Sequence, residues 1–354
     1  MDIFKDLKVI ELASVLAGPS VGMFFAELGA KVIKIENKTT GGDVTRRWKN
    51  DLEDTELPVS AYYSSVNFYK EVVFADLKDE GDRDAVLAEI STADIVICNF
   101  KKGSAARLKM DYAHLKTIKS DLIYAQINGM SEGDDRPAFD VVLQAETGFI
   151  SMTGEEGGGY VKMPVALIDL LAAHQLKQAI LVALYNRERT GDGAYTEVSL
   201  YESGLASLAN QASNFLMTGF IPKPMGTRHP NICPYGDVLE SKDGIDFVIA
   251  IGTEKQWESV CDYWKLDTQL KQMKNSERVK NRSLIIKACR KVTSRISSEI
   301  LFDDLKKLKI PFGVIKNLRE VLEGKEAEKM IIEESQEGVF KRGIKSVGFH
   351  IFYP

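Results

Sequence analysis

Short apolar runs alternate with amphipathic segments through the first half of the chain. Helical patterns include residues 21–28 and 84–90. The apolar runs that predict strands are residues 8–12, 31–36, 71–75, 94–98 and 122–127. Strands and helices that alternate at these spacings are typical of a parallel sheet with helices on its faces. The pattern therefore predicts the α/β class, with a Rossmann-like large domain.

The middle of the chain holds a long, mostly apolar stretch, residues 164–191, which predicts a core helix. This stretch ends in basic residues followed by Gly191, as the C-terminus of a helix prefers. A strand is predicted next at 195–200, followed by a helix at about 202–217.

The pattern changes after residue 218. Residues 220–226 include Pro222, Pro224 and Gly226, which indicates a linker. The elements predicted beyond it are strands at 235–240 and 246–251 and helices at 255–264, 283–292 and 299–308. We therefore predict a large domain over 1–218, a smaller α+β domain over 225–325 and a returning C-terminal tail over 326–354.

The first turn between a strand and a helix argues against a dinucleotide cofactor. A dinucleotide-binding turn needs the pattern G-x-G-x-x-G, because the backbone must approach the pyrophosphate closely. Residues 14–20 read Ser-Val-Leu-Ala-Gly-Pro-Ser, with a single glycine followed by proline. The Rossmann-like pattern is therefore not taken as evidence for NAD.

Composition narrows the class of protein further. A net charge of -5 and a pI near 5.6 argue against a protein that binds nucleic acid. The four cysteines form no C-x-x-C pair, and the four histidines leave little material for a zinc site, so no metal is expected. The N-terminus is charged, and no stretch approaches the roughly 18 apolar residues of a membrane span. We therefore expect a cytoplasmic protein with free thiols and no membrane partner.

Asp169 is a carboxylate with apolar neighbours on both sides, within residues 164–173. Two interpretations are open. An aspartate at this place can cap a helix by accepting hydrogen bonds from its first N–H groups. A desolvated carboxylate at a helix N-terminus can also act as a nucleophile, and the two roles do not exclude each other.

Other polar residues follow predicted strands or precede predicted helices. Asp140 lies just after a polar loop, where it could cap a helix or form part of a site. Asn99 and Phe100 follow the strand at 94–98, and α/β proteins place ligands at that end of a strand. Arg107 could reach a phosphate or simply lie on a helix surface. A plain turn remains an equal alternative for the 99–103 loop.

Taken together, these and other residues resemble the class III coenzyme A transferases, a family typified by formyl-CoA and carnitinyl-CoA transferases. The likeness covers residues 5–330 and depends on many pieces in the same order. These pieces are Leu16-Ala17-Gly18-Pro19, residues 28–36, Gly42-Asp43 with Arg46, Asn67, Lys70, Asp76-Leu77-Lys78, residues 94–100 with Gly103, Phe139-Asp140 with Gln144, Gly148, Thr153-Gly154, residues 187–193, Ser199-Leu200, Gly226 with His229-Pro230, Pro234-Tyr235, Asp243-Gly244 and residues 310–314.

The resemblance implies a fold and a mechanism that the residues alone do not give. It implies a homodimer in which two chains interlock as rings. It also implies that Asp169 matches the family's nucleophilic aspartate, which forms a mixed anhydride with the acyl group and then an aspartyl-CoA thioester. Coenzyme A would be a co-substrate, with no tightly bound cofactor, and the partners would be acyl-CoA and carboxylic acids.

The resemblance also assigns site residues. By analogy, the CoA site is lined by Val15, Ala17, Asn99, Phe100 and Arg107. Asp140 and Gln144 would lie near the reacting groups.

Two positions depart from parts of the family. Lys38 stands near the place where some relatives have an arginine beside the nucleotide. Leu16 replaces the glutamine of formate-specific relatives, which argues against a formyl or oxalyl substrate. Leu16 and Phe139 together suggest an apolar acyl pocket.

Two alternative functions remain open. The same fold hosts α-methylacyl-CoA racemases, which use a histidine directly before the aspartate that matches Asp140. Phe139 occupies that position here and cannot transfer a proton, which disfavours the racemase. The other alternative is a non-catalytic acyl-CoA-binding homologue in which Asp169 does not react.

Overall fold

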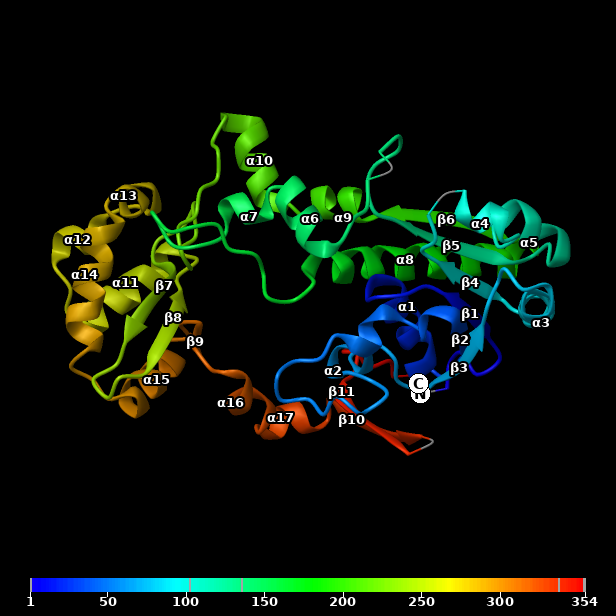
Figure 1. Cartoon of the computed structure of the whole chain (residues 1–354). Helices are drawn as coiled ribbons and strands as arrows, with labels where there is room; N and C mark the ends of the chain where they lie inside the picture. The colour runs from blue at the N-terminus through cyan, green and yellow to red at the C-terminus, as the bar shows by residue number, and fades with distance from the viewer. Residues whose placement is uncertain (1, 102, 135, 337, 353–354) are drawn as a thin grey trace. The chain divides into compact units, whose positions relative to one another are not determined.

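The computed structural model describes residues 2–101, 103–134, 136–336 and 338–352. The chain divides into two compact units, whose elements are labelled in Figure 1. Unit 1 comprises residues 1–153, 160–223 and 329–354, and unit 2 comprises residues 154–159 and 224–328. The tail from residue 329 on therefore belongs to unit 1, while its last two residues lie outside the described part. The sequence pattern did not predict that residues 154–159 join the smaller unit.

Unit 1 is built on a six-stranded sheet in which every neighbouring pair is parallel. Its strands are β1 (Lys8–Leu12), β2 (Lys31–Asn37), β3 (Lys70–Ala75), β4 (Ile95–Cys98), β5 (Ile123–Asn128) and β6 (Ala194–Ser199). Their order across the sheet is β3-β2-β1-β4-β5-β6, which is the order of a Rossmann fold. The α/β prediction for this unit is confirmed.

Helices pack on both faces of this sheet. The helices of unit 1 in the described residues are α1 (Ala17–Glu27), α2 (Ala61–Ser64), α3 (Glu80–Ile90), α4 (Ser104–Arg107), α5 (Tyr112–Ile118), α6 (Asp140–Glu146), α7 (Phe149–Met152), α8 (Leu167–Thr190), α9 (Leu200–Ala206) and α10 (Ala209–Thr218). Two 3-10 turns, η1 (Lys38–Thr40) and η2 (Val44–Arg47), follow β2.

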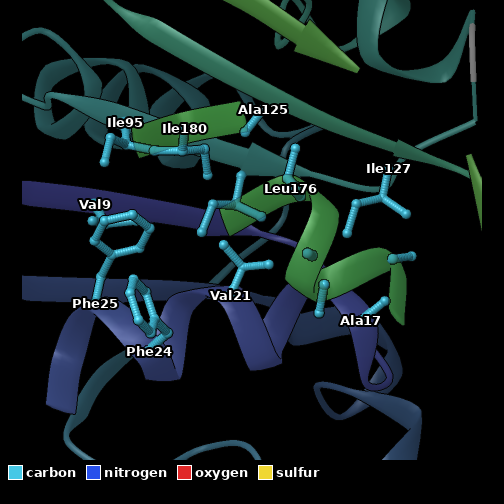
Figure 2. Packing of buried hydrophobic residues seen from close by; sticks show 14 of the residues in the cluster. Val9, Ala17, Val21, Phe24, Phe25, Ile95, Ala125, Ile127, Leu176 and Ile180 are labelled. Carbon is cyan, nitrogen blue, oxygen red and sulfur yellow. The ribbon is translucent and has the colours of Figure 1, made fainter. Parts of the chain in front are cut away.

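Successive strand residues point to opposite faces and so enter two different cores. Val9, Ile95 and Ala125 pack against α1 and α8, where Phe24, Phe25, Leu176 and Ile180 meet them in Figure 2. Their neighbours Ile10, Val96 and Tyr124 pack on the other face with α3 and α5 residues such as Ile90 and Leu115. Ala172 and Ala173 are fully buried in the first core.

Helix α8 corrects one statement made from the sequence. By length and composition it is apolar enough to cross a membrane, although no such stretch was identified from the pattern. Its Ile168, Leu176 and Ile180 belong to the buried core on the sheet, so α8 is the central core helix of unit 1. It ends at Gly191, whose N–H donates to the Arg187 carbonyl (2.8 Å) with φ of 77°, as the basic-then-glycine ending predicted.

The single helix predicted over 202–217 is wrong. The structure has α9 and α10 instead, separated at Ser207 and Leu208. Ala209 adopts a φ of 46°, which lies outside the right-handed helical region and breaks the helix there.

The returning tail forms a hairpin that packs on unit 1. Its strands are β10 (Ile331–Gln336) and β11 (Val339–Ile344), which pair antiparallel. Lys341 of β11 donates from Nζ to the Asn67 carbonyl (2.6 Å), and Ile332 of β10 is buried beside Phe68. The Glu27 carboxylate then accepts from the backbone N–H groups of residues 346 and 347.

Unit 2 combines a small antiparallel sheet with helices, as the α+β prediction requires. The strands are β7 (Tyr235–Glu240), β8 (Asp246–Ala250) and β9 (Phe312–Val314), in the order β7-β8-β9. The helices are α11 (Glu254–Tyr263), α12 (Thr268–Gln272), α13 (Asn275–Lys280), α14 (Arg282–Thr293), α15 (Ser298–Lys307), α16 (Leu318–Leu322) and α17 (Lys325–Glu328). Trp257, Phe247 and Leu301 are buried in its separate core.

Candidate active site

A cavity lies at the carboxyl ends of the first strands of unit 1. The strand order reverses beside β1, and open α/β sheets bind ligands in the crevice formed at such a reversal. The cavity has a volume of about 500 Å³. Its walls include Ser14 after β1, Asn37 at the end of β2, Lys78 after β3 and Phe100 after β4. Phe100, predicted from the sequence, is therefore part of this cavity.

The loop between β1 and α1 is held in a strained shape at the edge of this cavity. Val15 has a φ of 73°, a conformation that a β-branched residue rarely adopts. Its N–H donates to Asp43 Oδ2 (3.1 Å). Asn99 accepts from the Ser14 N–H (3.2 Å) and donates to the Ser14 carbonyl (2.9 Å). Two side chains thus determine the course of the loop, and Asn99 has a positioning role that the sequence did not reveal.

Asp43 itself belongs to a buried network of charges. Lys34 Nζ lies 2.8 Å from Glu11 Oε1 and 3.1 Å from Asp43 Oδ2, and Lys70 Nζ lies 2.8 Å from Glu11 Oε2. The side chains of Glu11, Lys34 and Lys70 are fully buried. Helix α1 makes room for them through Gly22, where a Cβ would lie 1.9 Å from Glu11 Oε2.

The pairing in this network keeps its lysines charged near neutral pH. Burial by itself lowers the pKa of Lys34, but the carboxylates of Glu11 and Asp43 outweigh it and raise that pKa above the ordinary value. Burial lowers the pKa of Lys70 to about 8, with Glu11 opposing the shift. The network therefore contains its own counter-charges.

Asp169 lies at the start of α8 in a different environment. It is the third residue of the helix, is 6% exposed, and forms no hydrogen bond or ion pair within the described residues. Burial, together with the nearby Asp140 carboxylate, raises the pKa of Asp169 to about 7. The capping interpretation is wrong, because Ala166 is the N-cap residue and Asp169 accepts no helix N–H.

Asp140 supplies the cap that Asp169 does not. Its Oδ1 accepts from the backbone N–H of Ile168, the second residue of α8, at 2.7 Å. Its Oδ2 accepts from Gln144 Nε2 (2.6 Å), and Gln144 Oε1 accepts from the Met163 N–H (2.8 Å). Asp140 and the fully buried Gln144 therefore fix the segment that leads into α8 and position Asp169.

Tyr62 feels the charge of Asp169 and belongs to a group of aromatic and aliphatic side chains. The rings of Trp48 and Tyr62 are 5.1 Å apart, and those of Trp48 and Phe139 are 6.4 Å apart. Burial and the charges of Asp169 and Asp140 raise the pKa of Tyr62 to about 12, so its hydroxyl keeps its proton and can donate. Leu16 is buried in a cluster against which Tyr62 and the α8 residue Leu170 pack.

Two cations predicted to contact CoA, Lys38 and Arg107, do not line the cavity, whereas two other cations do. Lys38 pairs with Asp82 and does not line the cavity, and exposed Arg107 donates to Ser104 Oγ. Arg47 and Lys78 do line it, and neither forms an ion pair within the described residues. The position of Lys78 directly after the predicted strand at 71–75 was the signal that could have identified it.

The remaining predicted residues are grouped around the loop after β1. Val15 packs beside Leu16, and Ala17 is the first residue of α1. Leu12, Ala13 and Ser14 face the cavity, whereas Leu16 packs toward the start of α8. A single loop therefore contributes both to the cavity and to the surroundings of Asp169.

Comparisons with known proteins show the family of the chain. A family model described as CoA-transferase family III matches residues 4–353. A succinate–glutarate CoA-transferase of Agrobacterium fabrum is 38% identical over 73% of this chain, and the match spans 65% of that protein's length. A succinyl-CoA:mesaconate CoA-transferase of Haloarcula hispanica is 32% identical over 91% of this chain and 83% of its own.

The fold also matches a solved structure. A crystal structure of a CAIB/BAIF family protein from Brucella suis superposes with a TM-score of 0.81 at 33% identity. The match covers 98% of this chain and 91% of the Brucella chain.

Proposed function

The chain belongs to CoA-transferase family III, and on this basis we propose that it moves CoA from an acyl-CoA donor to a carboxylic acid with Asp169 as the nucleophile. The observation that carries the proposal is the isolation of this carboxylate: it is buried, unpartnered within the described residues and raised in pKa to about 7. A buried carboxylate without a counter-charge is destabilised, so attack on a carbonyl, which removes its charge, becomes more favourable.

The proposed transfer conserves the energy of the thioester in four exchanges. The Asp169 carboxylate attacks the donor thioester carbonyl, the C–S bond breaks, and the CoA thiolate leaves a mixed anhydride behind. The thiolate attacks the aspartyl carbonyl of this anhydride and releases the donor acid as its carboxylate. The acceptor carboxylate then attacks the aspartyl-CoA thioester, which breaks the C–S bond and gives a second mixed anhydride. The released thiolate attacks the acceptor's acyl carbonyl in this anhydride and displaces the Asp169 carboxylate. The products are the new acyl-CoA and free Asp169 carboxylate, with no net proton change.

Neighbouring side chains can assist these steps. The protonated Tyr62 hydroxyl is available to donate to the oxyanion that forms at each attacked carbonyl. Trp48, Phe139 and Leu16 provide apolar surface, and substrate packed on it would keep water from the anhydride, which water would otherwise hydrolyse. Asp140, whose oxygens already accept from Ile168 and Gln144, acts by positioning α8.

The position of the cavity suggests how CoA binds. We propose that the nucleotide end occupies the cavity at the carboxyl ends of β1–β4, with Arg47 and Lys78 facing its phosphates. The pantetheine arm would then cross the loop at 14–17 toward Asp169. Ser14 lines the cavity, and Leu16 lies in a cluster against which Leu170 of α8 packs, which supports this path.

The names of similar proteins suggest the donor and acceptor acids. The two similar transferases reported above carry succinate, glutarate and mesaconate in their names, all of them dicarboxylates. We propose a dicarboxylate acceptor and a short acyl-CoA donor.

We also propose the interlocked homodimer. The end of α10 and the residues after it expose Leu216, Met217 and Ile221 at 79%, 84% and 65%, an apolar segment that a monomer would leave in water. A second copy of the chain would cover it.

Chemical trapping tests the nucleophile. The chain is incubated with succinyl-CoA in the presence of hydroxylamine or borohydride, and the modified residue is mapped by mass spectrometry. We expect modification at Asp169 that requires the donor and is absent from Asp169→Asn. Transfer activity is expected to fall by about a thousandfold or more in Asp169→Ala.

The alternatives give different results in the same assay. An unmodified Asp169, together with transfer activity retained by Asp169→Ala, would overturn the proposal. Proton exchange at Cα of a branched acyl-CoA without CoA transfer would identify a racemase. CoA binding with neither activity would identify a non-catalytic homologue.

A further inference from the structure

Unit 2 has an open cavity of its own, which the proposed transfer does not use. Its volume is about 610 Å³, and it is bordered by the linker at 225–228, by β7 and by α14. Basic side chains outnumber acidic ones along its walls. The basic residues are Arg228, Arg282, Lys287 and Arg290, and the acidic residues are Glu155 and Asp237.

Two of these four cations already have partners. Arg282 pairs with Asp237 through its Nη1 (2.6 Å) and donates from Nη2 to two backbone carbonyls. Arg228 pairs with Glu156, which is largely exposed. These contacts fix the cavity wall and leave little charge for a ligand.

The other two cations are available. Lys287 forms no hydrogen bond or ion pair with any part of the chain that the structure describes. Arg290 donates from Nε and Nη2 to the Val238 carbonyl, and its positive charge has no acidic partner among the described residues. Glu155 is the only other unpaired charge described on the walls, so the available charge remains positive.

These two residues share one face of α14 with a further donor. Ser283, Lys287 and Arg290 are spaced by four and three residues, which places them on the same side of a helix. Ser283 is the second residue of this twelve-residue helix, where a backbone N–H has no partner within the helix and the helix dipole is positive.

We propose that this cavity binds a compact anion with at least two negative charges, such as a di- or tricarboxylate or a phosphate compound. Lys287 and Arg290 supply charge and Ser283 supplies hydrogen bonds. A single negative charge gains little, because the Glu155 carboxylate also faces the cavity. The site is separate from the cavity of unit 1 and does not depend on the proposed transferase activity.

Calorimetric titration of the full chain tests this site. Citrate and inorganic phosphate serve as probes at constant ionic strength, and acetate serves as the monoanion. Asp169→Asn is the background, so that no transfer can contribute heat. We expect citrate or phosphate to bind more tightly than acetate, and Lys287→Glu to weaken that binding by about tenfold or more.

Lys291→Glu is the matched control, because it makes the same charge change on α14 outside the cavity walls. We expect it to change affinity by less than about twofold, since a charge outside the cavity walls is separated from the anion by screening solvent. The proposal is overturned if neither probe binds, if acetate binds as tightly, or if Lys291→Glu weakens binding as much as Lys287→Glu. Competition by CoA that Lys287→Glu abolishes would also overturn it, since the cavity would then be a CoA site.

Discussion

Two of the places where unit 1 buries charge behave in opposite ways. In the network of Glu11, Lys34, Asp43 and Lys70, each carboxylate lies within 3.1 Å of at least one ammonium group. Asp169 is almost as deeply buried, at 6% exposed, but no cation faces it within the described residues. Burial alone therefore does not determine whether the ionised form of a carboxylate is stable, because this also depends on whether a group of opposite charge lies beside it.

The difference indicates two distinct uses of a buried charge. A paired network stabilises one backbone arrangement, here the strained Val15 whose N–H donates to Asp43. An unpaired carboxylate destabilises the fold in its ionised form. A reaction that removes its charge therefore relieves this destabilisation. Asp140 connects both uses, because it positions α8 and also raises the pKa of Asp169.

Removal of a cation from the network gives the largest expected change in stability. Lys34→Met leaves Asp43 without a cation and Glu11 with Lys70 alone. We expect the free energy of unfolding to fall by about 3–5 kcal/mol, as measured by denaturant titration, because an uncompensated charge remains buried. Lys31→Met on the same strand is the control, since Lys31 is exposed and, among the described residues, pairs only with exposed Glu71. Its expected effect is within about 0.5 kcal/mol. Equal effects of the two substitutions would contradict the structural role of the network.

Removal of the charge of Asp169 is expected to have the opposite sign. Its folded pKa of about 7 exceeds the ordinary value near 3.9 for an unfolded chain. The protonated form is thus favoured by folding, and stability is lost as pH rises from about 4 to 7. We expect Asp169→Asn to have little effect at pH 4 and to stabilise the protein by about 2–4 kcal/mol at pH 8. A gain that does not depend on pH would argue against a raised pKa.

The cations at the cavity mouth extend the comparison to exposed charge, where the smallest effects are expected. Lys78 and Arg47 form no ion pair within the described residues, whereas Lys38 is paired with Asp82. We expect Lys78→Ala or Arg47→Ala to raise KM for the CoA thioester about five- to tenfold with kcat little changed. Lys38→Ala should change KM by less than about twofold. The reverse ranking, in steady-state assays, would place the phosphates nearer Lys38.

Much of the fold could be predicted because its strands are continuous apolar runs. The predicted strand at 8–12 has the bounds observed for β1, and the bounds predicted for the other sheet strands of unit 1 differ from those observed by at most one residue at each end. The break at Ala209 was not predictable, since alanine favours helix and its left-handed φ is imposed by tertiary structure. Hairpin β10–β11 was also missed, because its strands mix charged and apolar residues and are stabilised by distant contacts such as that of Lys341 with Asn67.

The candidate site was harder to predict than the fold. Asp169 could be selected as a carboxylate among apolar residues, but its lack of a partner depends on the placement of Asp140, 29 positions earlier. Tyr62 and Asp43 carry no local signal, because their roles arise only when distant segments meet at α8 and at the loop after β1. Spatial proximity across the chain is the information that a single sequence does not contain.

The contact between Glu11 and Gly22 has a consequence for protein engineering. A Cβ at position 22 would lie 1.9 Å from Glu11 Oε2, so no larger side chain fits there while the glutamate stays. A shorter residue at position 11 would open that space but would also deprive Lys34 and Lys70 of their shared carboxylate. The residues at positions 11, 22, 34 and 70 therefore depend on one another for stability. A mutant library that randomises any one of them alone should yield few folded clones, and variants that survive are expected to change several of these positions together.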